Sequence, residues 1–97
     1  MELLDFGKLL ADETRQKIMK ACCCQKLTVT EIVAQITVTQ PTVSHHLKLL
    51  RDAGLVVSER RGKEIYYSLN QNKFVNGCCA LANTFAPDMP LEIIGKE

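Results

Sequence analysis

The sequence predicts a mainly α fold of about five helices with one small β-hairpin of two strands, on the basis of three patterns. Apolar residues recur at helical spacing over most of the chain, capping residues mark several helix starts, and near residue 55 the apolar period changes from helical to alternating. The 97 residues, 46% of them hydrophobic, allow one compact domain, residues 1–97, whose small core leaves a monomer only marginally stable. Dimerisation would remedy that, so a homodimer is expected.

Two short helices are expected before residue 25. Leu3, Leu4, Leu9 and Leu10 indicate the first of them. The second is expected to begin after Asp12, whose side chain can cap it, while Glu13 favours the positive end of the helix dipole. The apolar face of this second helix comprises Ile18, Met19, Ala21 and Cys22.

The third and fourth helices have clear start signals. Thr28 and Glu31 have the spacing of a capping box, in which each side chain satisfies an unpaired amide at the helix start. Thr39 can cap the fourth helix, Pro41 suits its first turn, and Gly54 stands where a helix usually ends in a left-handed conformation. The residues expected to face inward are Ile32, Val33, Ile36, Val43, Leu47 and Leu50.

A β-hairpin is expected over residues 55–69. Its apolar positions, Leu55, Val57, Ile65, Tyr67 and Leu69, alternate with polar ones on either side of a basic tip at Arg61 and Gly62. The hairpin is therefore expected to form a wing beside the helices.

A final amphipathic helix is expected over residues 71–86. Phe74, Cys78, Leu81 and Phe85 recur at helical spacing and have no evident partner within the monomer. We expect this helix to pack against a second subunit.

The third and fourth helices, residues 28–53, followed by a basic hairpin, form the arrangement that places one helix in the major groove of DNA, a winged helix-turn-helix. The net charge of +1 does not by itself indicate a nucleic-acid partner, but five cations fall within sixteen residues. The predicted contacts with double-stranded DNA are Thr39, Gln40, Thr42, Ser44 and His45 at the start of the fourth helix, Lys48 and Arg51 further along it, and Arg60, Arg61 and Lys63 on the wing.

Three segments resemble the ArsR/SmtB family of repressors in order and spacing, over about residues 5–75: LADETRQKIM, TVTEIVAQITVTQPTVSHHLKLLRDAGLV and ERRGKEIYYSL. The resemblance implies a winged-helix homodimer, joined by its first and last helices, that covers a palindromic operator and leaves when an inducer binds. It also implies DNA contacts at Gln40, Ser44, His45 and the wing tip, residues 60–63. One departure is Thr37, which stands in the turn where many such proteins place glycine.

Two known inducer sites of this family are absent. Arsenite-sensing relatives carry a CVC pair at the start of the third helix, where this chain has Thr28 and Thr30. Zinc-sensing relatives carry aspartate and histidines along the last helix, where this chain has NQNKFVNGCCALANTF, without histidine or carboxylate.

The five cysteines are bunched in two places, which indicates neither a disulfide framework nor a zinc ribbon. Cys22 and Cys78 fall on apolar faces and suit the core. We hypothesise that Cys23 or Cys24, together with Cys78 and Cys79, forms a thiol-based inducer site where the second and last helices pack near each other. In one form of this hypothesis the thiols bind arsenite or a soft metal ion such as cadmium or lead. In the other they form a disulfide or a persulfide. Beyond such a ligand, the sequence specifies no cofactor.

Other classes of protein are less well supported. No apolar run approaches the ~18 residues of a membrane span, and acidic residues stand near the N-terminus where a signal peptide would have basic ones, so a cytoplasmic protein is expected. An enzyme is not expected, because no base adjoins a cysteine and no phosphate-cradling glycine loop exists. Two alternatives stay open: a regulator without cysteine sensing, and a protein–protein adaptor, which would show no salt-dependent affinity for DNA.

Overall fold

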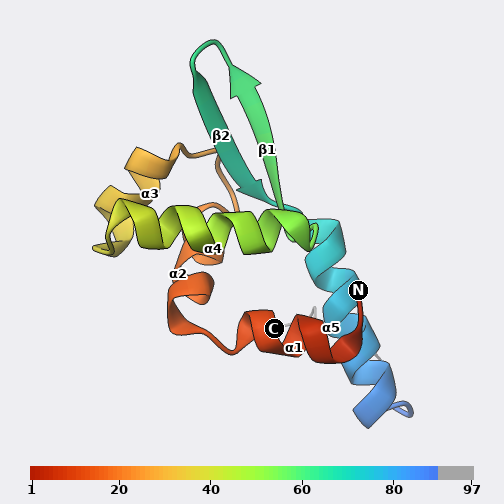
Figure 1. Ribbon diagram of the computed structural model, residues 1–97. Coiled ribbons are helices and arrows are strands. Elements are labelled where there is room, and N and C mark those ends of the chain that lie inside the picture. The colour runs from red at the N-terminus through yellow and green to blue at the C-terminus, as the bar shows by residue number, and fades with distance from the viewer. Residues whose placement is uncertain (90–97) are drawn as a thin grey trace.

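The computed structural model describes residues 1–89, which form five helices and one antiparallel two-stranded sheet (Figure 1). The elements are α1 (Leu3–Leu10), α2 (Glu13–Ala21), α3 (Val29–Ile36), α4 (Gln40–Asp52), β1 (Val56–Arg61), β2 (Glu64–Leu69) and α5 (Gln71–Phe85). This confirms the mainly α winged-helix fold, with one small β-hairpin as the wing. Residues 90–97 of the expected domain lie outside the described part. No helix within residues 1–89 is long and apolar enough to cross a membrane.

Two of the expected helix caps are present. The Asp12 carboxylate accepts a hydrogen bond from the Arg15 amide at 2.9 Å at the start of α2. Thr28 and Glu31 form the complete capping box of α3, with bonds of 3.2 and 2.9 Å. These local bonds satisfy amides that have no partner within the helix, so both helices begin where the sequence indicates.

The turn between α3 and α4 differs from the expectation in one respect. Thr39 is the cap residue of α4, but its hydroxyl donates to the Thr42 hydroxyl at 2.9 Å and accepts no amide, so the predicted capping bond is wrong. Pro41 lies in the first turn, as expected. Thr37 has φ 58° and ψ 44°, a left-handed conformation that is strained for a β-branched residue.

The core lies where α4 packs against α2, α3 and β1. Its buried residues are Phe6, Ile18, Met19, Cys22, Leu27, Ile32, Val43, Leu47, Leu50, Leu55 and Val56. Each fully buried aliphatic or aromatic side chain contributes about 1.5–3 kcal/mol. The core therefore fixes the position of α4 from three sides.

The wing begins one residue later than the alternating pattern suggests. Leu55 closes the end of α4, because its amide donates to the Leu50 carbonyl at 2.9 Å, and it lies outside the strand. Val56 pairs with Leu69 on the inner face and is buried, whereas Val57 is 45% exposed. Not every apolar position of the alternating pattern therefore lies on the inner face of the hairpin.

The hairpin is closed at its tip and attached at its base. Gly62 has φ +61° and follows Arg61, which pairs with Glu64, so the two-residue loop has glycine where a left-handed conformation is needed. At the inner end, Leu27 and Tyr67 exchange two main-chain hydrogen bonds of 2.7 and 3.0 Å. The segment before α3 thus adds a third, very short partner to the sheet.

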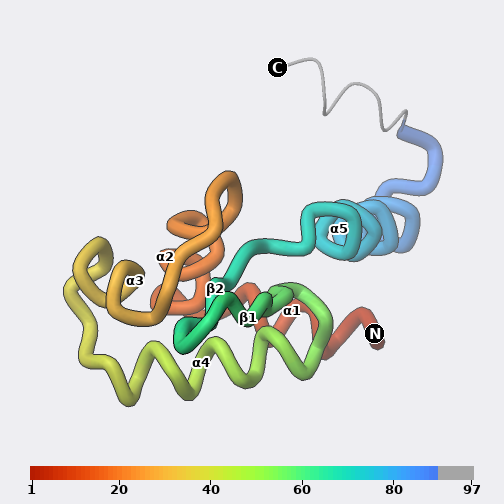
Figure 2. Tube along the Cα trace, turned by 90° about the horizontal axis from the view of Figure 1, so that it is seen from above, coloured from red at the N-terminus to blue at the C-terminus, as the bar shows by residue number. Residues whose placement is uncertain are grey.

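Helix α5 lies beside α1, on the opposite side of the molecule from α3 (Figures 1 and 2). The rings of Phe6 and Phe74 are 6.0 Å apart, and Cys78 and Leu81 pack against the core. The expectation that this apolar stripe has no partner within the monomer is therefore wrong for its first part. It holds for the end of the stripe, since Phe85 is 77% exposed.

Candidate nucleic-acid interface

Helix α4 has one buried face and one exposed polar face. Val43, Leu47 and Leu50 are at most 1% exposed and hold the helix on the core. The exposed residues at positions 40, 44, 48 and 51 recur at intervals of four, four and three, which places them on one face. These residues are Gln40, Ser44, Lys48 and Arg51. The structure thus brings four of the predicted DNA contacts into one stripe.

The first turns of α4 present further polar groups. Thr39, Thr42 and His45 are exposed. The Thr39–Thr42 hydrogen bond orients both hydroxyls at the entry of the helix. His45 is exposed and His46 is half-buried, with their ring centres 5.7 Å apart, so His45 is the histidine available to a groove.

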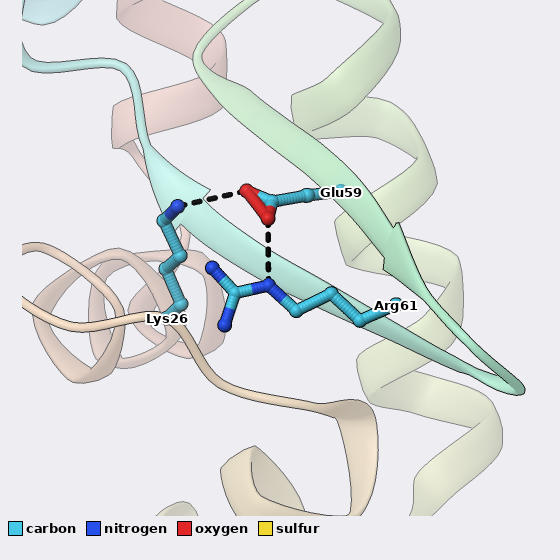
Figure 3. A network of polar contacts seen from close by, with 3 residues as sticks. All are labelled: Lys26, Glu59 and Arg61. Atoms are coloured by element: carbon cyan, nitrogen blue, oxygen red, sulfur yellow. Dashed lines mark hydrogen bonds and ion pairs between the residues drawn. The ribbon is translucent and has the colours of Figure 1, made fainter.

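The wing carries an ion-pair network that the sequence did not indicate (Figure 3). Glu59 accepts from Lys26 Nζ at 2.7 Å and from Arg61 Nε at 2.6 Å, and these two bonds lower the pKa of the Glu59 carboxyl. The Arg61 guanidinium also lies 5.4 Å from the centre of the Tyr66 ring. Arg61, which is a predicted DNA contact, thus already forms an ion pair with Glu59 and contacts Tyr66 within the wing.

The remaining wing cations are differently placed. Arg60 donates from Nε to the Gly62 carbonyl at 3.3 Å, which directs it toward the hairpin tip. Within residues 1–89, neither Arg60 nor Lys63 forms an ion pair. On α4, Arg51 has only a long contact of 4.0 Å with Asp52. Within the described residues, Lys48, Arg60 and Lys63 are therefore the predicted cationic contacts that form no ion pair.

A second polar network, which the sequence does not indicate, joins α2 and α4. Arg15 Nη1 is 3.1 Å from His46 Nδ1, and the two residues are 31 positions apart in the chain. Burial is the main cause that lowers the pKa of His46; the Asp12 carboxylate opposes this shift, and the charge of Arg15 adds to it. Nothing in the local sequence signals such a contact, because it depends on how α2 and α4 pack.

The cysteines differ in accessibility. Cys22 is fully buried, and desolvation raises its pKa to about 11, so it is a core residue as expected. Cys23 is half-buried, and its pKa is raised first by a hydrogen bond with the exposed Cys24 thiol and then by burial. Cys78 and Cys79 are both half-buried, and burial raises the pKa of Cys78.

The structure does not gather these thiols into one group. Helix α5 packs mainly on α1, and α2 is not among the elements with which it makes extensive contact. The residues that follow α2 meet the end of β2 and the start of α5 through two hydrogen bonds, from the Leu69 amide to the Cys22 carbonyl at 2.9 Å and from Gln71 Nε2 to the Cys23 carbonyl at 2.7 Å. Cys78 lies seven residues beyond Gln71, about 10 Å along the helix. No three histidine, cysteine or carboxylate side chains within residues 1–89 are placed to hold a metal ion.

A helix-turn-helix whose second helix presents a polar face beside a cationic hairpin defines a winged-helix DNA-binding regulator. The chain belongs to the ArsR family: the family described as "Bacterial regulatory protein, arsR family" matches residues 12–58. This is a family of regulators and not of enzymes, and the resemblance seen in the sequence is confirmed.

Individual relatives agree with this assignment. The chain is 37% identical over 75 residues to a "Transcriptional repressor SmtB homolog" of Synechocystis sp., covering 77% of this chain and 57% of that protein's length. It is 40% identical over 79 residues to the "Arsenical resistance operon repressor" of Bacillus subtilis, covering 74% of each. Among solved structures, an ArsR-like transcriptional regulator from Rhodococcus sp. superposes with a TM-score of 0.81 at 25% identity, over 88% of this chain and 78% of that one.

Proposed function

We propose that the chain is a homodimeric repressor that binds palindromic, double-stranded operator DNA in the bacterial cytoplasm. The observation that carries this proposal is the exposed polar stripe of α4, held in place by a buried apolar face on the same helix. Such a stripe at the start of a second helix is what major-groove readout requires.

In this proposal the contacts divide into two kinds. Gln40, Ser44 and His45 reach base edges, where amide, hydroxyl and imidazole groups can discriminate between bases. The residues that bind sugar and phosphate are Thr39, Thr42, Lys48, Arg51, Arg60, Arg61 and Lys63. Arg61 must first leave Glu59, so its contribution is expected to be smaller than that of Arg60 or Lys63.

The proposed dimer interface consists of α1 and α5. Helix α5 has no buried residue in the single subunit, although it is the longest helix of the described chain. Its Val75 and Phe85 are 54% and 77% exposed, and Leu4 on α1 is 67% exposed. Exposed apolar side chains on two adjacent helices support a surface that another subunit covers.

The proposed inducer acts on thiols at Cys23, Cys24, Cys78 and Cys79. Cys24 is exposed and the other three are half-buried, so a thiol-reactive molecule can reach them. Arsenite and soft metal ions prefer thiolates, and an oxidant or a reactive sulfur species would give a disulfide or persulfide. The relative from Bacillus subtilis is named for arsenical resistance, which supports a trivalent arsenical as one ligand.

The two hydrogen bonds at the junction of β2 and α5 give such an inducer a route to the DNA-binding surface. A ligand on Cys23 or Cys24 displaces the Cys22 and Cys23 carbonyls, which hold Leu69 and Gln71. A shift there would turn α5 and hence alter the spacing of two recognition helices, which must match about one turn of DNA.

The test is a titration of reduced protein onto its own promoter DNA, repeated with arsenite, cadmium or a polysulfide donor. We expect tight, salt-sensitive binding that one of these agents reverses. The double variants C23S/C24S and C78S/C79S should bind as the wild type does but respond less, whereas the control C22S, whose thiol is buried, should respond normally. If the protein does not bind the promoter DNA, the proposed repressor function is wrong. If both double variants respond normally to the inducer, only the proposed thiol site is wrong.

A further inference from the structure

The side chain of Arg15 joins three elements. Its Nε donates to the Leu9 carbonyl at 3.0 Å and its Nη2 to the Lys8 carbonyl at 3.2 Å, at the C-terminal end of α1. Its Nη1 lies 3.1 Å from His46 Nδ1 on α4. Arg15 itself belongs to α2. We call this set, Arg15 with His46 and the two carbonyls, the Arg15 latch.

The latch determines the protonation state of His46. A guanidinium has only N–H groups and cannot accept a hydrogen bond. The Nδ1 atom of His46 must therefore be the acceptor, which leaves the ring neutral with its proton on Nε2. Protonation of Nδ1 would remove the acceptor and place two cations in contact.

We propose that Arg15 is a positioning residue for the recognition helix α4, and that the latch holds α4 in its DNA-binding position only while His46 is neutral. Operator affinity then decreases on acidification. The inference rests on the proposed operator binding but not on the thiol site. It also connects α1, an element of the proposed dimer interface, directly to the helix that reads DNA.

The surroundings of His46 place this change below neutral pH. The groups that act on its ring are Asp12 and Arg15 from α2 and His45 from α4 itself; no charged group of α1, α3 or the wing within the described residues contributes. Asp12 favours the protonated ring, but burial outweighs it and the pKa of His46 lies below the ordinary 6.5. Histidine is the side chain that ordinarily titrates between pH 7.5 and 5.5, and the chain has two histidines. Few groups besides His46 can therefore change charge in this range.

Simple electrostatics predicts the opposite trend. A protonated histidine near DNA adds a cation to a surface facing phosphates and should raise the affinity as the pH falls. The exposed His45 is placed to act in this way. A decrease on acidification is therefore specific to a latch that requires a neutral His46.

The experiment measures operator affinity at pH 7.5 and 5.5, at constant salt and with reductant, for the wild type and two single variants. H46N keeps an acceptor near the position of Nδ1 but does not titrate, and H45N is the matched control on the same helix. Because each subunit of the proposed dimer takes up one proton, the loss at pH 5.5 is limited to about tenfold per subunit and about a hundredfold for the dimer, and we expect at least threefold for the wild type. H45N should lose at least as much, and H46N should change less than twofold.

Several outcomes would overturn the inference. The first is a wild-type operator affinity that stays constant or rises on acidification. The second is a loss of affinity on acidification that disappears in H45N. The third is an H46N variant that folds but does not bind the operator at pH 7.5. Wild-type binding at pH 7.5 with no dependence on pH leaves the proposed function standing and defeats the latch alone. Absence of binding at pH 7.5 defeats both.

A second measurement uses the wild-type protein alone, so it does not require that a variant folds. Nitrogen-15 NMR of the imidazoles distinguishes an accepting nitrogen from a protonated one. We expect His46 in the Nε2–H form at pH 7.5, with a midpoint below pH 6.5 that falls further on the operator complex. A Nδ1–H form, or an equal midpoint in the free and bound protein, would contradict the latch.

Discussion

Arg15 Nη1 lies 3.1 Å from Nδ1 of His46, and this contact ties the second helix to the middle of the fourth. It has a consequence for stability as well as for binding. The pKa of His46 is lower in the folded chain than the ordinary 6.5 that an unfolded chain would have. As the pH falls below 6.5, the unfolded chain takes up a proton that the folded chain does not.

The neutral His46 is therefore expected to contribute fully to the free energy of unfolding above pH 6.5. This contribution should decrease as the pH falls toward the lowered pKa of His46. Thermal unfolding at pH 7.5, 6.5 and 5.5 would measure this decrease. The carboxyls whose pKa is lowered, Asp12 and Glu59, start from 3.8 and 4.5 and act only at more acidic pH. H46N should remove most of the dependence, and an equal dependence in H46N would disprove this explanation.

Gly77 is expected to be intolerant of a side chain. A methyl group added there would lie 2.5 Å from two ring carbons of Phe6, which is buried between α1 and α5. Overpacking costs about 1–3 kcal/mol, against a gain of about 1 kcal/mol from helix propensity. Urea unfolding of Gly77→Ala should thus show a net loss of stability.

Gly7 provides the matched control for Gly77, since it also lies in a helix but an added methyl group meets nothing within 4 Å. Gly7→Ala should stabilise the protein by about 0.5–1 kcal/mol. Similar effects of both substitutions, at the same protein concentration, would show that the contact with Phe6 does not limit the packing of α1 on α5.

Thr37 is expected to be a site of removable strain. Its φ of 58° is a conformation that costs a residue with a side chain about 1–2 kcal/mol. Thr37→Gly should raise the melting temperature, although the greater freedom of glycine in the unfolded chain offsets part of the gain. Thr28→Gly, at a cap with φ −77°, should lower it, and a lower melting temperature for both would argue against strain at Thr37.

The ion pairs of Glu59 are expected to weaken DNA binding by holding two cations. E59Q should release Lys26 and Arg61, and the slope of log affinity against log salt should steepen by about 1 per subunit, or about 2 for the proposed dimer, if Arg61 then binds a phosphate. R60A should make the slope shallower by about 1 per subunit, or about 2 for the proposed dimer. Filter binding or fluorescence anisotropy at several salt concentrations measures both slopes; an unchanged slope for E59Q would show that Arg61 stays on the wing.

The cysteines are expected to react in order of their exposure. At pH 8 a thiol with a pKa of about 11 is ionised in about one molecule in a thousand, and Cys22 is also fully buried. Timed alkylation followed by mass spectrometry should modify Cys24 first and Cys22 last. Early modification of Cys22 would indicate that the end of α2 opens readily.

The local signals in the sequence determined most of the elements and the class of protein. Helix starts at Asp12 and Thr28, and the glycine at the hairpin tip, depend on bonds or conformations within a few residues, so the chain segment itself specifies them. The polar stripe of α4 was predictable for the same reason, because helical periodicity places residues four apart on one face.

Tertiary structure alone decided the contacts between distant segments. The inner face of the wing starts at Val56 because Leu55 closes α4, and α5 lies on α1 because Gly77 admits the Phe6 ring. The Arg15–His46 contact and the engagement of Arg61 by Glu59 likewise depend on packing, the first joining residues 31 positions apart. Periodicity assigns a residue to a face of its own element, but it does not state which element covers that face, since that depends on the shapes of all the faces that compete for it.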